Sequence, residues 1–576
     1  MKRYLAVLLL LLFLFTACSD AITIVTLPPA TSGSTSPDNV GTTSPDNVGT
    51  TSPDTVGTTS PDTVGTTSPD TVGTTSPDTV GTTSPDTVVT AAPDTTGTPP
   101  KPIDPNCHKD ADNNGICEIC SKSVIVVIDF YAVNDLHGKF KDSASQPGVD
   151  ELTTYLKNAQ KTDDHTVFLS SGDMWQGSSE SNLTEGLILT EWMNRLGFVS
   201  MTVGNHEYDW GDKAIEKNAA LATFPILAIN IYSRATNEPM PYTKPSVLIE
   251  RGGVKIGIIG AVGDCYSSIA ADKSENVYFK TGSQLTALVK AESDRLKAAG
   301  ADFIVYSIHD GYGSSKSGVS DLAASAFSSY YDTALSNGYV DLVFEAHTHQ
   351  NYVLRDNYGV YHLQGGGDNK GITHAEISVN VANGNAVTNT AEYLPSSRYT
   401  SLQGDAIVDE LLEKYESLIS KGDEVLGTNS SYKSSKVLCQ LVADLYYEAG
   451  MAKWDSDYDI ALAGAFIKAR SPYNLSAGNV TYGQLQMIFP FDNNIVLCSI
   501  KGRDLKRVFY TSPNENYYMK YALRVSDIQD NATYYVITDT YSSTYSYNNM
   551  TEVKRLDDTT FARDLLADYV RDGKMR

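Results

Sequence analysis

The stretch VIVVIDFYAVNDLHGKF (residues 124–140) decides the fold of this chain. Its first half is apolar enough to be buried on both faces, as a strand inside a layered sheet is. Its second half releases Asp135 and His137, two residues apart, where the strand is expected to end. Residues at i and i+2 lie on the same side of an extended backbone, so we expect both side chains to face one point in space.

The same pattern recurs further along the chain. Apolar runs stop on polar or glycine residues in TVFLSSGD (166–173), VSMTVGNH (199–206), KIGIIGAVGD (255–264), DFIVYSIHDG (302–311) and DLVFEAHTH (341–349). A helical pattern, LTALVKAESDRLKAA (285–299), lies between two of these runs. This alternation predicts an α/β layered fold. In such sheets the loops at strand ends form the functional site, because side chains leave the core there without leaving the scaffold.

Five of these runs end in side chains of the kinds that bind metals. Five of the nine histidines in the chain are among them. The candidates are Asp135, His137, Asp173, Asn205, His206, His309, His347 and His349. Nitrogen and oxygen donors without thiolate suit Zn, Mn or Fe and argue against a structural zinc site. A single carboxylate among imidazoles can bridge two cations, and Asp173 is central in the order.

The order D-x-H, G-D, G-N-H-E, a lone His and H-x-H resembles the calcineurin-like metallophosphoesterases. The spacing within NDLHG (134–138) and GNHEYD (204–209) resembles the secreted 5′-nucleotidase branch, which includes UDP-sugar hydrolases and 2′,3′-cyclic phosphodiesterases. The resemblance implies a four-layer α/β/β/α sandwich over residues 124–395 and a second α+β substrate-binding domain over 424–576. A linker helix would lie between them, at 396–423, where DAIVDELLEKYESLISK (405–421) has helical spacing.

The resemblance also implies how the candidate ligands divide. One cation would be bound by Asp135, His137 and His349 and the other by Asn205, His309 and His347, with Asp173 bridging them. Two divalent ions about 3.5–4 Å apart lower the pKa of a water between them, and the resulting hydroxide attacks phosphorus in line. Zn, Mn, Fe and Co all fit such ligands. A glycine usually precedes the first histidine of the last motif, whereas Ala346 does here, which is tolerable if φ is not positive.

The remaining residues of GNHEYD have separate expected roles. His206 would not bind metal but would donate a proton to the leaving or equatorial oxygen, and Asp209 would orient its imidazole and keep it protonated. We expect Glu207 and Tyr208 to pack the loop. We expect His165, His362 and His374 to be structural.

The second domain keeps only part of the family pattern. In AGAFIKARSPYNLSAGNVTYGQLQMIFPFDNN (463–494), Arg470 resembles the arginine that binds phosphate and Phe491 the aromatic that stacks on the base. Tyr541 would stack on the opposite face, and Asn205 would also contact substrate. The N-G-G that usually precedes the arginine is replaced by AFIKA (465–469), and the G-G-D-G by YSYN (545–548). Nucleotide preference is therefore less firmly indicated than phosphoester hydrolysis.

The first 105 residues are not expected to fold. Lys2 and Arg3 precede a short apolar run that ends in T-A-C at Cys18, the layout of a signal peptide (1–18) with a bacterial lipobox. The segment 19–105 contains repeats of the form TSPDTVGT and reads as a disordered Ser/Thr/Pro stalk. We therefore expect an extracellular lipoprotein held at the bacterial cell surface by a lipid on Cys18.

A small module is expected at residues 106–122. CHKDADNNGICEIC (107–120) offers three thiols and His108 for zinc, or Asp110, Asp112 and Asn114 for calcium, or a disulfide in an oxidising compartment. The three alternatives stay open. The cysteines outside the module, Cys265, Cys439 and Cys498, are expected to be buried thiols.

The net charge of −25 limits the partners. Nucleic acid is not expected, because so acidic a surface repels a polyanion, and an anionic substrate needs a local positive charge such as a bound metal.

From the family resemblance we expect a phosphohydrolase of nucleoside 5′-monophosphates. The alternatives are a cyclic phosphodiesterase or UDP-sugar hydrolase of the same family, or a surface binding protein with a degenerate substrate domain. The oligomeric state is not indicated.

Overall fold

The computed structural model describes residues 109–142, 147–311, 339–356, 358–458, 465–468, 473–511, 517–520, 523–544 and 549–575. The signal peptide, the stalk, Cys107, His108 and Arg470 lie outside these ranges. Within them, no helix has the length and apolar character needed to cross a membrane.

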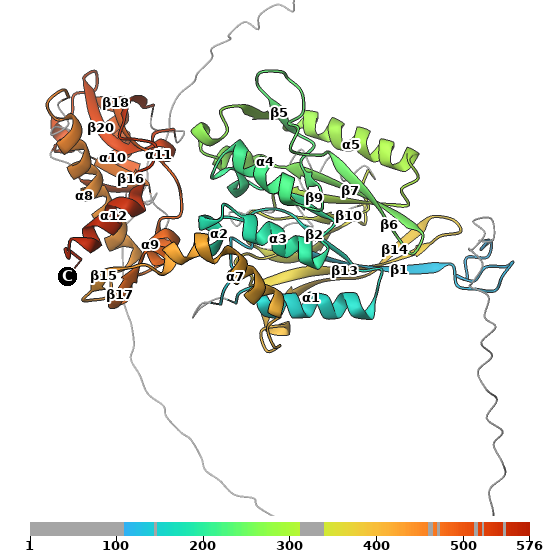
Figure 1. Ribbon diagram of the computed structural model, residues 1–576. Helices are drawn as coiled ribbons and strands as arrows, with labels where there is room; N and C mark the ends of the chain where they lie inside the picture. The colour runs from blue at the N-terminus through green and yellow to red at the C-terminus, as the bar shows by residue number, and fades with distance from the viewer. Residues whose placement is uncertain are drawn as a thin grey trace, which may run out of the picture. The chain divides into compact units, whose positions relative to one another are not determined.

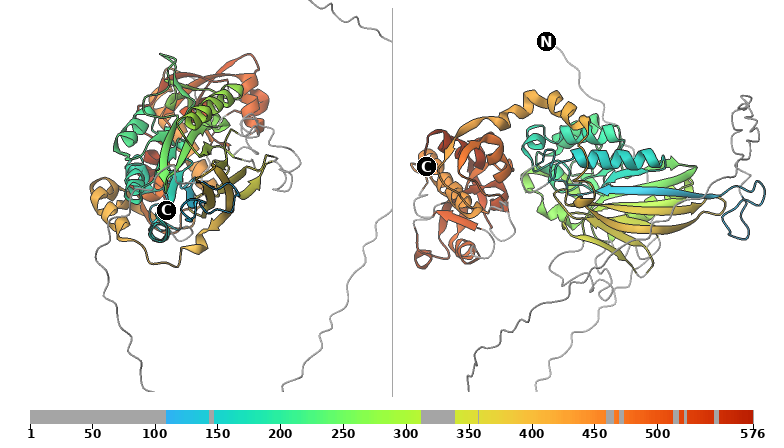
Figure 2. Two further views of the ribbon diagram at one scale, coloured as in Figure 1. Left: turned by 90° about the vertical axis from the view of Figure 1, so that its right-hand side faces the viewer. Right: turned by 90° about the horizontal axis from the view of Figure 1, so that it is seen from below.

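The opening stretch forms the centre of a six-stranded sheet. The strand order is β14-β13-β1-β2-β3-β4, with β1 to β4 parallel and β13 and β14 antiparallel to their neighbours. The right-hand view of Figure 2 shows β1, in blue, running beside the long yellow strands β13 and β14. The strands are β1 (Ile125–Val133), β2 (Val167–Ser170), β3 (Ser200–Thr202), β4 (Ile226–Leu227), β13 (Gly371–Asn380) and β14 (Asn385–Pro395).

A second six-stranded sheet contains the remaining apolar runs. Its order is β11-β12-β10-β9-β7-β6, and β7, β9, β10 and β12 are parallel. The strands are β6 (Ser246–Arg251), β7 (Val254–Val262), β9 (Phe303–His309), β10 (Leu342–Phe344), β11 (Asn351–Arg355) and β12 (Tyr361–Gly365). A separate two-stranded sheet pairs β5 (Ile231–Ser233) with β8 (Val277–Phe279).

The two large sheets pack face to face, with helices outside. Phe130 of β1 lies 6.1 Å from Phe303 of β9, ring centre to ring centre, in a core drawn from both sheets. α1 (Asp150–Thr162), α3 (Leu187–Leu196) and α4 (Asp212–Leu221) cover the first sheet, and α5 (Ser283–Ala298) covers the second. In Figure 1, α1 below and α5 above enclose the strands. The predicted α/β/β/α sandwich is confirmed.

Beyond residue 405 the chain forms a helix and then a second sheet. α7 (Ala406–Ile419) begins where the carboxylate of Asp405 accepts the N–H of Ile407 at 3.0 Å, as an N-cap does. The five-stranded sheet has the order β19-β16-β20-β18-β21. Its strands are β16 (Ala465–Lys468), β18 (Ile495–Lys501), β19 (Tyr517–Lys520), β20 (Thr533–Asp539) and β21 (Thr551–Arg555).

Helices cover both faces of this second sheet. α8 (Ser435–Trp454), α9 (Tyr482–Ile488) and α12 (Ala562–Arg571) share one apolar core with it, and α10 (Gly502–Thr511) contacts the strands that form the other. α11 (Thr540–Thr544) follows β20 directly, α2 (Ser179–Leu183) lies between β2 and α3, and β15 (Val425–Asn429) pairs with β17 (Gly478–Thr481). This arrangement agrees with the predicted α+β class for the second domain.

Candidate metal centre

The side chains released at five strand ends come together in space. Three overlapping groups have one ligand atom per residue within 4.8 Å of each other: Asp135–His137–His349, His137–Asp173–His206 and Asp135–Asp173–His309. The ring of His347 lies 5.5 Å from that of His309, centre to centre. Parallel strands explain the convergence, because their carboxyl ends share one edge of each sheet.

The backbone reaches this point by a route that the sequence did not indicate. φ is +48° at Asp135 and +49° at His137, and +67° at His347 and +54° at His349, so the expectation of an extended backbone at these two pairs is wrong. Left-handed residues cost roughly 1–3 kcal/mol each and persist where tertiary contacts impose them. Here the N–H of Asp135 donates to Gly172 O at 2.9 Å and that of His137 to Asp173 O at 3.0 Å. The loop after β1 is thereby held against the loop after β2.

Ala346, which replaces the expected glycine, has no positive φ. Its methyl group is therefore accommodated without backbone strain, as the sequence analysis required.

His137 and His349 present their ring nitrogens to each other. Nδ1 of His137 donates to Gln176 O at 3.2 Å, which leaves the lone pair on Nε2. That Nε2 lies 2.9 Å from Nε2 of His349, which in turn lies 3.4 Å from Asp135 Oδ1. Two imidazole nitrogens and a carboxylate oxygen thus converge in the way that ligands of one cation do.

On the other side of Asp173, His309 and Asn205 also offer donor atoms to a cation. Nδ1 of His309 donates to Ser171 O at 2.8 Å, so Nε2 is the nitrogen that faces Asp173. Burial lowers the pKa of His309, but the carboxylates of Asp173 and Asp135 outweigh it and raise the pKa to about 10, so a cation bound at Nε2 would displace a proton from it. Nε2 is buried 3.1 Å from Asp173 Oδ2 without hydrogen-bond geometry, and Asn205 Oδ1 is buried with no hydrogen-bond partner in the part of the chain that the structure describes. Buried polar atoms are normally satisfied, and a cation beside both would satisfy them.

The charges around these donors also favour a cation. The side chains of Asp135 and Asp173 are almost wholly buried. Burial raises the pKa of each carboxyl, but the surrounding histidines outweigh it and hold both below the usual range. Burial lowers the pKa of His137 and of His347 to about 4, so both imidazoles are neutral, the form that binds metal. The two anionic carboxylates, the neutral imidazoles of His137 and His347 and the amide oxygen of Asn205 fit a divalent ion such as Zn, Mn, Fe or Co.

His206 differs from the other histidines in its partner. Its Nδ1 lies 2.8 Å from Asp209 Oδ2, and its backbone N–H donates to Asp173 Oδ1 at 2.8 Å. Burial lowers the pKa of His206, but the carboxylates of Asp209 and Asp173 outweigh it and raise the pKa to about 9. At neutral pH this imidazole is a proton donor.

Glu207 holds the two central loops together, a role beyond the loop packing expected from the sequence. Its side chain is fully buried, and its oxygens accept the N–H groups of Asp173 and Met174 at 2.9 Å and of Gly204 at 2.6 Å. Burial and the charge of Asp173 raise the pKa of Glu207 to about 7. The carboxylate therefore fixes the bridging candidate Asp173 relative to the loop of Asn205 and His206.

Comparison with known proteins agrees with this geometry. The calcineurin-like phosphoesterase family matches residues 128–351, and the 5′-nucleotidase C-terminal domain family matches residues 421–530. An apyrase of Tabanus yao is 26% identical over 446 residues, which cover 70% of this chain and 76% of the relative. Protein UshA of Yersinia enterocolitica is 25% identical over 418 residues, covering 66% and 73%. The crystal structure of a candidate 5′-nucleotidase from Staphylococcus aureus shares the fold, with a TM-score of 0.62, 17% identity and coverage of 78% and 98%.

The chain belongs to the calcineurin-like phosphoesterases that carry a 5′-nucleotidase C-terminal domain. It is a metal-dependent phosphoester hydrolase. The resemblance read from the sequence is confirmed.

In this phosphoesterase the Phe491 loop is held by a residue that the sequence analysis missed. Arg563, near the start of α12, is buried and donates to Asp492 Oδ1, to Phe491 O at 3.3 Å and to Tyr482 Oη at 3.3 Å. The ring of Phe491 lies 5.8 Å from that of His206, nearly parallel at 20°. A positive charge in the first turn of a helix is unfavourable because it opposes the helix dipole. The position of Arg563 in the sequence could therefore have indicated that this side chain has a specific partner.

Arg470 and Tyr541 are the other residues of the second domain expected to bind substrate. Arg470 lies outside the described residues. Tyr541 lies on α11 and is half-buried, and the N–H of its neighbour Thr540 donates to Asn494 O at 2.9 Å. α11 therefore begins beside the loop of Phe491.

The remaining histidines have structural partners, as expected. Nδ1 of His362 lies 2.9 Å from Glu345 Oε1, and Nε2 of His374 lies 2.6 Å from Asp129 Oδ1. Nδ1 of His165 lies 3.2 Å from Val127 O.

In the small module, both oxygens of Asp110 accept hydrogen bonds, Oδ1 from Asn114 N and Oδ2 from Gly115 N, each at 3.0 Å. Burial raises the pKa of Cys117, but hydrogen bonds from Lys109 and Cys120 outweigh it and lower the pKa to about 7. The choice between zinc, calcium and a disulfide stays a prediction.

Proposed function

We propose that this phosphoesterase hydrolyses nucleoside 5′-monophosphates to nucleoside and phosphate. The observation that carries the proposal is the convergence of Asp135 and Asp173 with the ring nitrogens of His137, His309 and His349. The match to the 5′-nucleotidase C-terminal domain supports nucleotides as the substrate class.

Two divalent cations complete the site in this proposal. Asp135, His137 and His349 hold one and Asn205, His309 and His347 the other, with Asp173 between them. When bound, the pair supplies a water of lowered pKa and neutralises charge on the phosphoryl oxygens. The backbone carbonyls of Gln176 and Ser171 orient His137 and His309 so that Nε2 faces the cation.

His206 and Asp209 complete the proton balance. Attack by water forms a new P–O bond and breaks the bond from phosphorus to the 5′-oxygen, which leaves as an alkoxide unless protonated. The imidazolium of His206 donates this proton, and Asp209 keeps the ring charged and oriented. General acid catalysis of this kind contributes about 10²–10⁴-fold.

The second domain is proposed to select the nucleotide. Phe491 would stack on one face of the base and Tyr541 on the other, while Arg470 and Asn205 would contact the phosphate. Arg563 supports this role of Phe491, because its guanidinium donates to Phe491 O at 3.3 Å and so fixes the loop. The domain limits proposed are 124–395 for the metal domain, 396–423 for the linker and 424–576 for the substrate domain.

The proposed location is the bacterial cell surface. A lipid on Cys18 would anchor the chain, and the stalk of residues 19–105 would carry the enzyme away from the membrane. Nucleotides outside the cell would then be the substrates, and the net charge of −25 disfavours a nucleic acid polymer.

The test is a substrate panel at fixed metal. Metal-free protein is loaded in turn with Zn, Mn, Fe or Co, and the products are separated and quantified: nucleoside and phosphate from AMP, UMP and sugar 1-phosphate from a UDP-sugar, a nucleoside monophosphate from a 2′,3′-cyclic nucleotide, and phosphate from an aryl phosphate. The Asp173→Asn variant is the site control, and Asp294→Asn on α5, where the side chain is 60% exposed, is the surface control. Preference for AMP that depends on metal and on Asp173 supports the proposal. Preference for the cyclic nucleotide or the UDP-sugar would make that compound the substrate in place of AMP, and no metal-dependent hydrolysis of any of the four compounds would indicate a binding protein.

A further inference from the structure

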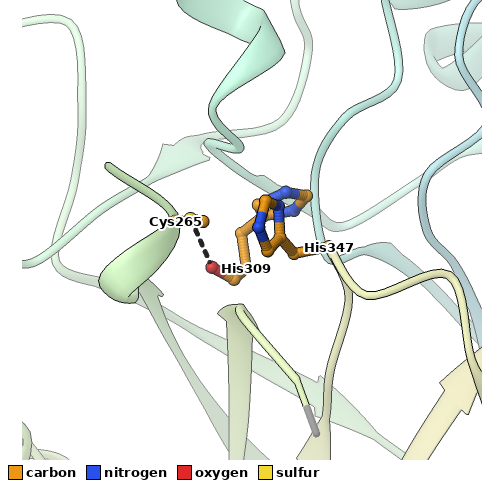
Figure 3. Close-up of side chains that lie close together, drawn as sticks. All are labelled: Cys265, His309 and His347. Atoms are coloured by element: carbon orange, nitrogen blue, oxygen red, sulfur yellow. Dashed lines mark hydrogen bonds between the residues drawn. The ribbon is translucent and has the colours of Figure 1, made fainter. Parts of the chain in front are cut away.

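A cysteine thiol lies beside the two histidines proposed to share a cation. Cys265 belongs to the 3₁₀ helix η2 (Asp264–Ser268) and is 4% exposed. Its Sγ, one ring nitrogen of His309 and one of His347 all lie within 4.8 Å of one another. Figure 3 shows the three side chains gathered at the end of β9. The sequence predicts Cys265 only as a buried thiol.

The backbone fixes this thiol at the site. The N–H of Gly263 donates to His309 O at 3.1 Å, and the N–H of Asp264 donates to Asp310 Oδ2 at 2.6 Å. The thiol of Cys265 donates to the same carbonyl of His309 at 2.8 Å, the dashed line in Figure 3. Three contacts therefore hold the start of η2 against the end of β9, where His309 stands.

We propose that Cys265 is a sulfur ligand of the cation held by Asn205, His309 and His347. This inference rests on the proposed function and changes the donor set from nitrogen and oxygen to nitrogen, oxygen and sulfur. A second observation supports it: Nε2 of His309, fully buried and without a hydrogen bond in the described structure, is available to the same ion. The ring of His347 contacts the ring of His309, so a nitrogen of His347 is the third donor of the group.

Coordination requires a defined proton balance. Without a cation, the sulfur of Cys265 carries its proton, because the thiol donates to His309 O. Binding breaks the S–H bond, forms a sulfur–metal bond and releases the thiol proton to solvent, while His309 O keeps the N–H of Gly263 as its donor. No oxidant or reductant takes part.

Thiolate is a soft donor, and its presence narrows the range of metals that the site would bind well. Zinc and cobalt accept thiolate with imidazole, whereas magnesium, calcium and manganese favour oxygen ligands. The His309 subsite is therefore expected to prefer zinc or cobalt over manganese, and the Asp135 subsite to be less selective.

The test is the absorption of the cobalt-loaded full chain. Thiolate bound to Co²⁺ gives a charge-transfer band in the near ultraviolet, which imidazole and carboxylate ligands do not give. The background carries Cys107→Ser, Cys117→Ser and Cys120→Ser, so that the small module does not contribute. Cys265→Ala and Cys265→Ser are compared with Cys498→Ala, a buried thiol of β18 in the second domain.

The band is expected in the background protein and in the Cys498→Ala variant, and its loss in both Cys265 variants. Those variants should also bind the second cobalt at least about tenfold more weakly and release one proton fewer per chain. A band that survives Cys265→Ser, or its absence from a background protein that binds two cobalt ions and hydrolyses AMP, overturns the sulfur ligand and leaves the proposed function intact. Failure of the background protein to bind cobalt at all overturns the proposed function as well.

Discussion

Nδ1 of His206 lies 2.8 Å from Oδ2 of Asp209, three residues further along the chain. The 3₁₀ helix η1 (His206–Tyr208) creates this contact by turning the backbone directly after the Asn205 position. Burial lowers the pKa of His206, but the carboxylates of Asp209 and Asp173 raise it to about 9. The proton needed by the leaving oxygen is therefore bound at neutral pH and is lost only in alkaline solution.

Replacing Asp209 by asparagine should shift the pH profile of kcat/KM. In the parent enzyme the protonated form of His206 persists up to about pH 9, so activity falls above that value. Without this carboxylate only Asp173 and Glu207 oppose the effect of burial, so the pKa of His206 falls and the alkaline limb moves to lower pH by about one unit. Asp212→Asn, on the neighbouring helix α4, should leave the limb in place. An unchanged limb in Asp209→Asn would remove this pair from the mechanism.

His206→Ala should separate catalysis from metal binding. None of the proposed ligand sets uses His206, so metal content should stay at two ions per chain while kcat falls by about 10²–10⁴-fold. Metal analysis and steady-state kinetics on the same preparation check both parts. Activity equal to that of the parent enzyme would show that the acid assignment is wrong.

The strands and the convergence of ligands were predictable from the sequence, whereas the loop conformations were not. Long apolar runs that stop at glycine or polar residues indicate buried strands, and β1, β7 and β9 formed where they were expected. Side chains after parallel strands then meet by geometry alone. Left-handed φ values at His137 or His349 could not be read from the sequence: histidine adopts them more often than most residues but still rarely, and here tertiary contacts impose them.

The contributions of Glu207, Arg563 and Cys265 depend on contacts between distant segments. Glu207 accepts from residues more than thirty positions away, and Arg563 reaches Phe491 across 72 positions. Single-sequence patterns describe local periodicity and do not identify such partners. The roles of these residues follow from contacts that exist only in the folded chain.

Glu207→Gln should weaken metal binding and lower the melting temperature. An amide keeps one acceptor oxygen, so at least one of the N–H groups of Asp173, Met174 and Gly204 loses its buried partner. An unsatisfied buried group costs about 1–3 kcal/mol. Thermal unfolding and metal titration measure the two effects, with Glu216→Gln on the exposed face of α4 as the control. Full metal affinity in Glu207→Gln would mean that Asp173 is positioned by other contacts.

Phe491→Ala should raise KM for AMP more than KM for a small aryl phosphate. Stacking of a base on an aromatic ring contributes about 1–3 kcal/mol, which corresponds to an increase of about 5- to 150-fold in KM. The aryl phosphate is the internal control, because it uses the metal site without a nucleobase. Equal effects on both substrates would show that Phe491 acts through His206, whose ring it contacts at 5.8 Å, rather than through the base.

Arg563→Lys should reproduce the effect of Phe491→Ala in weaker form. Lysine keeps the charge but cannot contact Phe491 O, Asp492 and Tyr482 at once, since these bonds use the three nitrogens of one planar guanidinium. The loop of Phe491 then loses its orientation, and kcat/KM should fall several-fold more for AMP than for the aryl phosphate. Arg571→Lys, at the other end of α12, is the matched control because its side chain is largely exposed beside Glu424. If Arg563→Lys lowers the melting temperature and reduces both substrates equally, Arg563 stabilises the domain without determining which substrate it accepts.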